Sequence, residues 1–244
     1  MESLDAVEQD VQGELELELL VAVATGAHWV RSNIEATYKR LGTADGVLGV
    51  PTTDEAADGT GGCAQSFQRG RIYWSSATGT QTVTGATLTA YTRAGGAKGI
   101  PGYPIAGEKS DGIGGYVQSF HKGRTVWSRL TGASAAQGSI GARYLNAKGQ
   151  AGVLGHPTAN EAPTSTGGSY QKLQKGRICR SSATGAREVL GRISTAYVGL
   201  GGTASRLGFP TSGETRAVDG STVQRFQGGT ITLRTNGTIR IDHH

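Results

Sequence analysis

Three polar side chains recur along the chain at a constant interval and are the first candidates for chemistry. Each occurs four times, and successive copies stand 53 residues apart. The three series are Tyr38, Tyr91, Tyr144 and Tyr197; Glu55, Glu108, Glu161 and Glu214; and Gln65, Gln118, Gln171 and Gln224. In a repeated binding site, Glu and Gln would hold ligand hydroxyls, and Tyr would stack on a flat ligand. Alternatively each side chain satisfies buried backbone groups, because buried polar groups are almost always paired. This structural role is favoured for Tyr and Gln, whereas both roles stay open for Glu.

A fourth series changes from copy to copy. Its members are Trp74, Trp127, Arg180 and Leu233. A fully buried position would not exchange Trp for Arg, because burying an unpaired charge is costly. We therefore expect this face to be open to solvent in some copies, and since Trp and Arg both stack on flat ligands, it is the first candidate for binding. The alternative is that Arg180 extends its charged end to solvent beside a packed position.

A fifth series consists of arginines that could contact an anionic polymer: Arg71, Arg124 and Arg177. The chain carries a net charge of +5, with 24 basic and 19 acidic residues. Seven acids and no base fall within residues 1–20, which leaves 24 basic against 12 acidic residues (19 minus 7), or +12, in residues 21–244. A basic body attracts anionic polymers, although it also suits ordinary solubility, and arginines beside hairpin turns are usually only solvated.

The sequence offers little support for catalysis. It contains no Gly-x-Ser-x-Gly, His-Glu-x-x-His or Cys-x-x-Cys motif. A glycosidase needs two carboxyl groups on one bond, and the repeated glutamates should be spread apart by the repeat. We therefore expect no enzyme, no cofactor and no metal site. Cys63 and Cys179 occupy different positions of the repeat, so a disulfide between them is not expected.

The element that must position these side chains is a 53-residue repeat built around a Leu-Gly-x-Pro turn. Copies begin at Leu48, Leu154 and Leu207, and a degenerate copy begins at Pro101. A fixed period of this size indicates a repeat architecture, in which small units share a core with their neighbours. We divide the chain into an acidic N-terminal segment plus half a repeat, 1–32, and four repeats, 33–85, 86–138 (degenerate), 139–191 and 192–242. The half repeat is inferred from Ala24-Thr25-Gly26, which matches Ala77-Thr78-Gly79.

Each repeat is expected to contain one short helix followed by β-hairpins. Ile34, Tyr38 and Leu41 have helical spacing, whereas the stretch from Gln65 to Ser75 is typical of a hairpin. The hairpin glycines Gly70, Gly123, Gly176 and Gly229 are expected to adopt positive φ in a tight turn. The fold class is therefore an α+β tandem repeat, mostly short β-hairpins with one helix per repeat. A closed, propeller-like ring would protect the strand edges.

These motifs resemble the LGFP repeat family. The resemblance rests on the run Leu207 to Thr211 with Glu214, on Leu48 to Thr52 with Glu55, and on Phe67 to Trp74, and it extends from about residue 19 to the end. It departs from the pattern at Pro101, Arg180 and Leu233. The resemblance implies a propeller-like module of actinobacterial envelope proteins, often attached to mycoloyltransferases or peptidoglycan-cleaving enzymes. There it is thought to bind wall glycan, arabinogalactan in particular.

Together these features predict a non-catalytic protein that binds cell-wall polysaccharide and is extracellular or wall-associated. The alternative is a structural or protein-interaction ring without a glycan ligand, with oligomers forming through the acidic N-terminal segment. Nucleic acid is not an expected partner, because no recognised nucleic-acid module is present. The N-terminus lacks the basic and apolar regions of a signal peptide, and no stretch is apolar for long enough to span a membrane.

Overall fold

The computed structural model describes residues 19–23 and 26–244 and contains four consecutive units of the same construction. Each unit has one nine-residue α-helix, a short 3-10 helix and a four-stranded antiparallel sheet. The expected order of one helix followed by strands is therefore confirmed. The acidic N-terminal segment, through which oligomers are expected to form, lies largely outside the described residues.

The elements follow the same order in every unit. Before the first unit, β1 (Leu19–Val23) pairs with β2 (Gly26–Val30). Unit one contains α1 (Ser32–Arg40), η1 (Thr43–Asp45), β3 (Ala56–Ala57), β4 (Gly62–Phe67), β5 (Gly70–Ser75) and β6 (Gly79–Thr84). Unit two contains α2 (Gly85–Arg93), η2 (Gly96–Lys98), β7 (Lys109–Ser110), β8 (Gly115–Phe120), β9 (Gly123–Ser128) and β10 (Gly132–Gln137). Unit three contains α3 (Gly138–Asn146), η3 (Gly149–Ala151), β11 (Ala162–Pro163), β12 (Ser169–Leu173), β13 (Gly176–Ser181) and β14 (Gly185–Leu190). Unit four contains α4 (Gly191–Gly199), η4 (Gly202–Ala204), β15 (Thr215–Arg216), β16 (Thr222–Phe226), β17 (Gly229–Leu233) and β18 (Ile239–His243).

Each helix is short because its C-terminal end is fixed by a left-handed residue. Shortly after the helix the chain reaches φ values of 91° at Gly42, 96° at Gly95, 66° at Lys148 and 103° at Gly201. Glycine adopts this conformation without a steric penalty, which is why it commonly follows helices. The turn redirects the chain into a 3-10 helix and then into the Leu-Gly-x-Pro segment.

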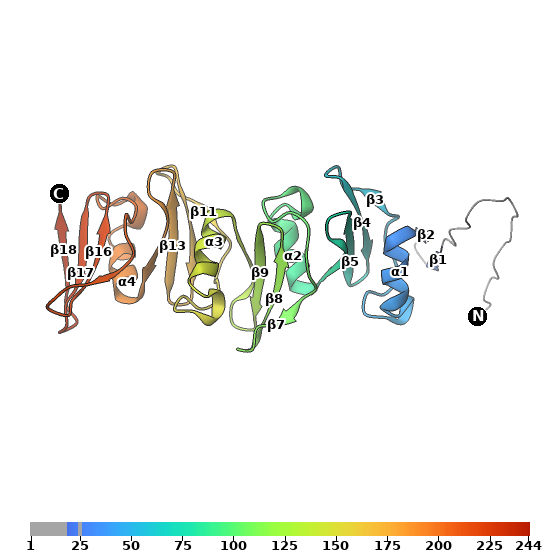
Figure 1. The fold of residues 1–244 in the computed structure, drawn as a ribbon, viewed down its shortest axis with the longest axis horizontal. Coiled ribbons are helices and arrows are strands. Elements are labelled where there is room, and N and C mark those ends of the chain that lie inside the picture. The colour runs from blue at the N-terminus through green and yellow to red at the C-terminus, as the bar shows by residue number, and fades with distance from the viewer. Residues whose placement is uncertain (1–18, 24–25) are drawn as a thin grey trace, which may run out of the picture.

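The helices lie between successive sheets. Helix α3 contacts β9 and β10 of the sheet before it and β13 and β14 of the sheet after it, and α4 likewise contacts β13, β14 and β17. The molecule is therefore a stack in which sheets and helices alternate, and Figure 1 shows the four units following one another along the long axis. None of the helices in the described part of the chain is long and apolar enough to cross a membrane.

Both faces of an internal sheet are buried, one against its own helix and the other against the next. In β13, Ile178 belongs to the core around α3, whereas its neighbour Cys179 belongs to the core around α4. In β5, Ile72 packs with Tyr38 of α1, and Tyr73 packs with Tyr91 of α2. Alternate residues of one strand thus supply two different cores, so each unit depends on its neighbours for burial.

The expected closed, propeller-like ring is not found among the described residues. The four sheets are separate, and the first and last units lie at opposite ends of the molecule (Figure 1). Consecutive sheets face each other across a helix, so the units extend in a line. One edge of each sheet is a strand of only two residues, and very short edge strands offer little to an incoming chain. One edge of each of these four sheets is thus protected without closure.

The expected positive φ is confirmed for Gly176 and Gly229, both at φ 154°, and is wrong for Gly70 and Gly123. These glycines are the first residues of β5, β9, β13 and β17, and the turn lies just before them. At these positions a carbonyl group of the paired strand comes so close that a side chain would not fit. A Cβ at Gly123 would lie 2.7 Å from the carbonyl oxygen of Ala136, and one at Gly176 would lie 2.2 Å from that of Val189.

The outer face of the last sheet is polar. Positions that carry Cys179 and Val189 in unit three carry Thr232 and Asp242 in unit four. Cys179 and Val189 are fully buried against α4, whereas Thr232 and Asp242 are partly exposed. The last sheet of the described chain therefore presents polar side chains at positions where an internal sheet presents apolar ones.

Candidate functional site

The repeated tyrosines are structural. All four are fully buried on the helices. The Tyr38 hydroxyl donates to the carbonyl of Gly49 at 3.1 Å, and Tyr91 donates to that of Gly102 at 2.8 Å. Tyr144 and Tyr197 make the same bond to Gly155 and Gly208. Each tyrosine thus fixes the Leu-Gly-x-Pro turn to the helix of its own unit, which excludes it from ligand stacking.

The repeated glutamines join neighbouring units. Gln118 Nε2 donates to the carbonyl of Thr82 in the preceding sheet at 2.7 Å and to that of Ala106 at 2.9 Å. Gln65, Gln171 and Gln224 make the equivalent pairs of bonds, and all four side chains are buried. The structural interpretation of the Tyr and Gln series therefore agrees with their placement.

A further contact between units was missed in the sequence. The variable residue of the Leu-Gly-x-Pro turn docks into a loop of the preceding unit: the Tyr103 hydroxyl donates to Asp58, and His156 Nε2 lies 2.8 Å from Asp111 Oδ2. A Cβ at Gly115 would lie 2.7 Å from His156 Nε2, so the glycine makes room for the histidine. The signal was present in the sequence, because this loop ends in Gly-Gly at 61–62, 114–115 and 167–168, whereas unit four has Gly220-Ser221 at the same place.

The arginine series lies at the junctions between units. A Cβ at Gly149 would lie 3.6 Å from Arg124 Nη1, and one at Gly202 would lie 3.9 Å from Arg177 Nη1. Arg71, Arg124 and Arg177 are all half-buried. In unit four, which no helix follows, the equivalent residue is Thr230. Arg124 and Arg177 therefore lie close to the 3-10 helix of the following unit, and the arginines of the series are not freely solvated.

The four glutamates lie one per unit and are not brought together. Glu108 Oε1 accepts a hydrogen bond from Thr87 on the first turn of α2, and Glu161 Oε1 accepts one from Ser169. Burial raises the pKa of Glu214, an effect that the backbone N–H of Leu190 opposes and the nearby Glu188 reinforces. This separation leaves no pair of carboxyl groups from the series that could act on one bond.

The fourth series differs from unit to unit, as expected. Trp74 packs partly against the first core, and Leu233 packs against the last. Arg180 is exposed on the strand β13. Trp127 is half-buried and lies opposite Tyr116 on the adjacent strand, with ring centroids 5.6 Å apart and planes tilted by 45°.

Tyr116 and Trp127 form what we call the aromatic surface of unit two. Tyr116 is 46% exposed, and together with Glu108 and the residues 84–87 that begin α2 it lines an open hollow of about 260 Å³. The other units have Cys63, Ser169 and Thr222 at the position of Tyr116. Tyr116 was missed as a site residue, although its cross-strand position opposite Trp127 follows from the hairpin register.

Other reactive groups do not form a site. Cys63 and Cys179 are free thiols, and burial with a hydrogen bond to Glu55 raises the pKa of Cys63 to about 12. The described residues contain no group of three or more His, Cys, Asp and Glu side chains that could hold a metal ion.

Comparison with known proteins finds one family. A model of the LGFP repeat matches residues 48–99, 102–152, 154–205 and 207–240. No match is found among curated proteins. Among solved structures, the extracellular domain of a protein described as a one component system of B. thetaiotaomicron is 13% identical, with a TM-score of 0.19. That comparison covers 79% of this chain and 25% of the other, so the chain spans about a quarter of its length. A catalytically inactive virginiamycin B lyase from Staphylococcus aureus is 8% identical, with a TM-score of 0.17 over 96% of this chain and 72% of the other.

Proposed function

Because this chain belongs to the LGFP repeat family, we propose that it is a non-catalytic repeat protein that binds and anchors to cell-wall glycan outside the cell. The ligand class is a polysaccharide of the arabinogalactan or peptidoglycan type. The observation that carries the proposal is the aromatic surface of unit two, where Tyr116 and Trp127 lie beside Glu108 in an open hollow.

The chemistry of this surface suits a sugar. The tilted rings of Tyr116 and Trp127 offer apolar faces on which the C–H groups of a pyranose or furanose ring can pack. Glu108 keeps one carboxylate oxygen beyond the one that accepts from Thr87, and a carboxylate is a strong acceptor for sugar hydroxyls. Trp74 with Glu55, and Arg180 with Glu161, offer related but weaker combinations in units one and three.

The absence of catalysis is part of the proposal. Glycoside hydrolysis requires two carboxyl groups on opposite sides of one bond. The repeated glutamates stand in four separate units, and Asp58 and Asp111 are engaged in contacts between units. Glu188, which lies near Glu214, is paired with Arg143, and Glu35 is paired with Lys39.

The proposal is tested by co-sedimentation with insoluble arabinogalactan and with peptidoglycan. Trp127→Ala should weaken binding strongly while lowering the melting temperature only slightly, because Trp127 is only half-buried. Leu130→Ala, which removes an 88% exposed side chain from the next turn, is the matched control and should bind like the wild type. A large fall in melting temperature, with unchanged binding per folded molecule, would place the tryptophan in the core and the site elsewhere.

A second candidate function is a protein-interaction scaffold. One exposed aliphatic side chain precedes the Leu-Gly-x-Pro turn in three units: Val47 is 63% exposed, Ile100 54% and Val153 62%. Repeated exposed apolar side chains favour contacts with another protein. Mass measurement in solution, beside a glycan array containing arabinan and galactan, separates the two functions. Self-association that Ile100→Ser abolishes, without glycan binding, would support the scaffold.

A further inference from the structure

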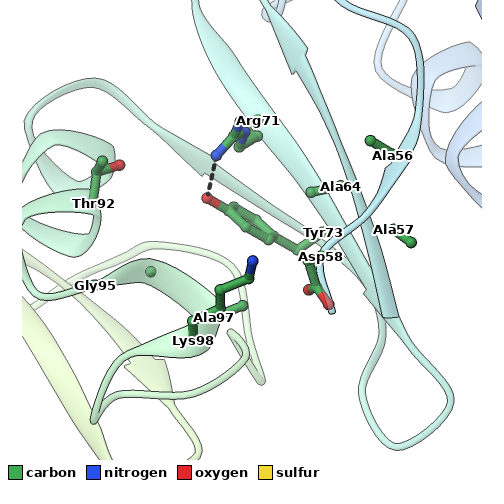
Figure 2. Close-up of a pocket in the computed structure, with 11 residues that line it drawn as sticks. Ala56, Ala57, Asp58, Ala64, Arg71, Tyr73, Thr92, Gly95, Ala97 and Lys98 are labelled. Carbon is green, nitrogen blue, oxygen red and sulfur yellow. Dashed lines mark hydrogen bonds between the residues drawn. The ribbon is translucent and has the colours of Figure 1, made fainter. Parts of the chain in front are cut away.

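The junction between units one and two contains a pocket of about 310 Å³. The sheet of unit one forms one wall with Ala57, Ala64 and Tyr73, and the end of α2 with the following turn forms the other. Figure 2 shows Arg71 and Lys98 reaching toward Tyr73 from these two sides. The pocket is distinct from the aromatic surface of unit two.

Two side chains that line the pocket are smaller here than at the other junctions. The position of Ala64 is Val117 in unit two and Tyr170 in unit three, and the position of Thr92 is Leu145 and Val198 in the next units. Val117 packs into the core at its junction. Tyr170 packs against the last core, and the Arg177 guanidinium lies 5.4 Å from its ring centroid. The first junction thus has small side chains at two positions where the later junctions have larger ones.

The two charged groups of the pocket that form no ion pair, Arg71 and Lys98, are both positive. Arg71 Nε donates to Ser66 Oγ at 2.9 Å and Nη1 reaches the Tyr73 hydroxyl at 3.5 Å, while its guanidinium lies 5.7 Å from the Tyr73 ring centroid. Within the described chain, neither Arg71 nor Lys98 forms an ion pair with a carboxylate.

One carboxylate, Asp58, lies on the wall, but it is already engaged. It accepts hydrogen bonds from the Tyr103 hydroxyl and from the N–H and hydroxyl of Thr60, at 2.9 and 2.8 Å for the latter two. These contacts hold the loop of unit one against unit two. The remaining charge therefore favours an anion, because Arg71 offers a planar fork of donors and Lys98 a compact ammonium.

We propose that this pocket binds an acidic sugar unit, with its carboxylate or phosphate group between Arg71 and Lys98. The volume is that of a small-ligand pocket, and the alanine walls provide an apolar surface for the sugar ring. Arg71 binds the anion through Nη2 and the second hydrogen of Nη1, and Lys98 supplies the second charge. The site extends the proposed function, since it is independent of the aromatic surface and adds a preference for an acidic ligand.

The test is calorimetric titration with D-glucuronate, D-glucose 6-phosphate and D-glucose at low ionic strength, where charge interactions are least screened. Binding of either acid, with D-glucose much weaker, supports the proposal. The stronger of the two acids identifies carboxylate or phosphate as the preferred group. Equal binding of D-glucose, or no binding of either acid, overturns it.

Variants localise the binding. Arg71→Gln and Lys98→Gln should each weaken binding of the preferred acid about tenfold, because each removes a charged donor. The double variant Ala64→Val with Thr92→Leu introduces the two larger side chains of the second junction and keeps both cations. Because it narrows the pocket, it should abolish binding. Its melting temperature should not fall, since it adds apolar packing.

Two controls separate this site from others. Arg177→Gln changes the equivalent arginine at the third junction, where Tyr170 stands at the position of Ala64, and should leave binding unchanged. Trp127→Ala should also leave binding of the acid unchanged. The proposal for the aromatic surface and the proposal for this pocket can therefore be contradicted separately. Wild-type affinity in a folded double variant would overturn the proposal.

Discussion

At the scale of single residues, the repeated glutamine shows why a polar side chain can be constant in a core. Gln118 is 1% exposed, and both hydrogens of its amide are used on carbonyl groups from two different units. Lysine or arginine would bring an unpaired charge into this position, and asparagine is too short to span the same gap. A neutral double donor of this length is therefore required wherever two units meet.

We predict that Gln118→Leu lowers the free energy of unfolding by about 2–6 kcal/mol, because each of the two carbonyls left without a donor costs about 1–3 kcal/mol. Urea denaturation measures the change. The control is Gln81→Leu, since Gln81 donates only to Thr78 within its own hairpin at 3.2 Å. A cost at Gln118 no larger than at Gln81 would mean that the two carbonyls find other partners.

The contact between Asp111 and His156 makes the junction of units two and three sensitive to acid. Burial opposes ionisation of Asp111, but hydrogen bonds from the N–H groups of Ile113 and Gly115 and from His156 outweigh it, so its pKa lies below the ordinary value. A carboxyl group with a lowered pKa in the folded state stabilises the protein above its unfolded pKa. That contribution is lost as the pH falls through the folded pKa.

We therefore predict that Asp111→Asn destabilises the protein at neutral pH and that its difference from the wild type shrinks below about pH 4, where an unfolded aspartate takes up its proton. Thermal unfolding of both proteins from pH 7 to pH 3 measures this difference. A difference that stays constant down to pH 3 would show that the ionised carboxylate does not stabilise the junction.

At the scale of elements, the sequence predicts what a unit contains better than how units meet. Helical spacing of Ile34 and Tyr38 and the hairpin pattern around Gly70 were enough to place α1 and β4–β5. The two-sided burial of β5, with Ile72 in one core and Tyr73 in the next, decides that sheets stack across helices. The repeat period shows which units are consecutive but not how consecutive units are oriented. For this reason a ring was expected, whereas the units form a line.

The hairpin glycines illustrate the same limit. The sequence shows that Gly123 is required but cannot distinguish a left-handed backbone from close approach of the next strand. Because a Cβ at Gly123 would meet the Ala136 carbonyl at 2.7 Å, we predict that Gly123→Ala costs at least about 1 kcal/mol through overpacking. Gly176→Ala, with the Val189 carbonyl at 2.2 Å, should cost more.

Gly107 is the matched control, since a Cβ there meets no atom within 4 Å and its φ is not positive. Gly107→Ala should be neutral or stabilise the protein by up to about 1 kcal/mol, because it restricts the unfolded chain. Chemical denaturation of the three variants tests the order. Equal stabilities for Gly123→Ala and Gly107→Ala would refute the close-approach explanation.

At the scale of the whole molecule, the candidate site was only partly foreseeable. The variation from Trp74 and Trp127 to Arg180 correctly indicated a face open to solvent in some units, but the pairing of Trp127 with Tyr116 needed the strand register. The pocket at Arg71 depends on side chains from two units, Ala64 and Thr92, and becomes visible only when the junctions are compared in space. Sites that one unit builds are therefore easier to predict than sites that two units share.

The end of the stack follows the same logic, because a sheet that no helix follows must present polar side chains. The sheet of unit three presents apolar side chains on this face, and it avoids water only because α4 covers it. Cys179 and Val189 are fully buried there. A chain ending after Leu190 would expose both, together with Arg177 and Tyr170. We predict that this shortened chain aggregates and unfolds irreversibly, since a contiguous apolar face is left in water.

Copying the polar end of unit four onto unit three should restore the shortened chain. Arg177→Thr, Cys179→Thr and Val189→Asp reproduce Thr230, Thr232 and Asp242, so the three changes together convert an internal sheet into a terminal one. We predict that the shortened chain with these changes is monomeric and unfolds reversibly, as size-exclusion chromatography and repeated thermal scans can establish. The same three changes in the full-length chain are the control, and there they should destabilise the protein, because α4 would then pack against polar side chains and a buried carboxylate. If the unchanged shortened chain is already monomeric and stable, the polar face of unit four has another purpose than ending the stack.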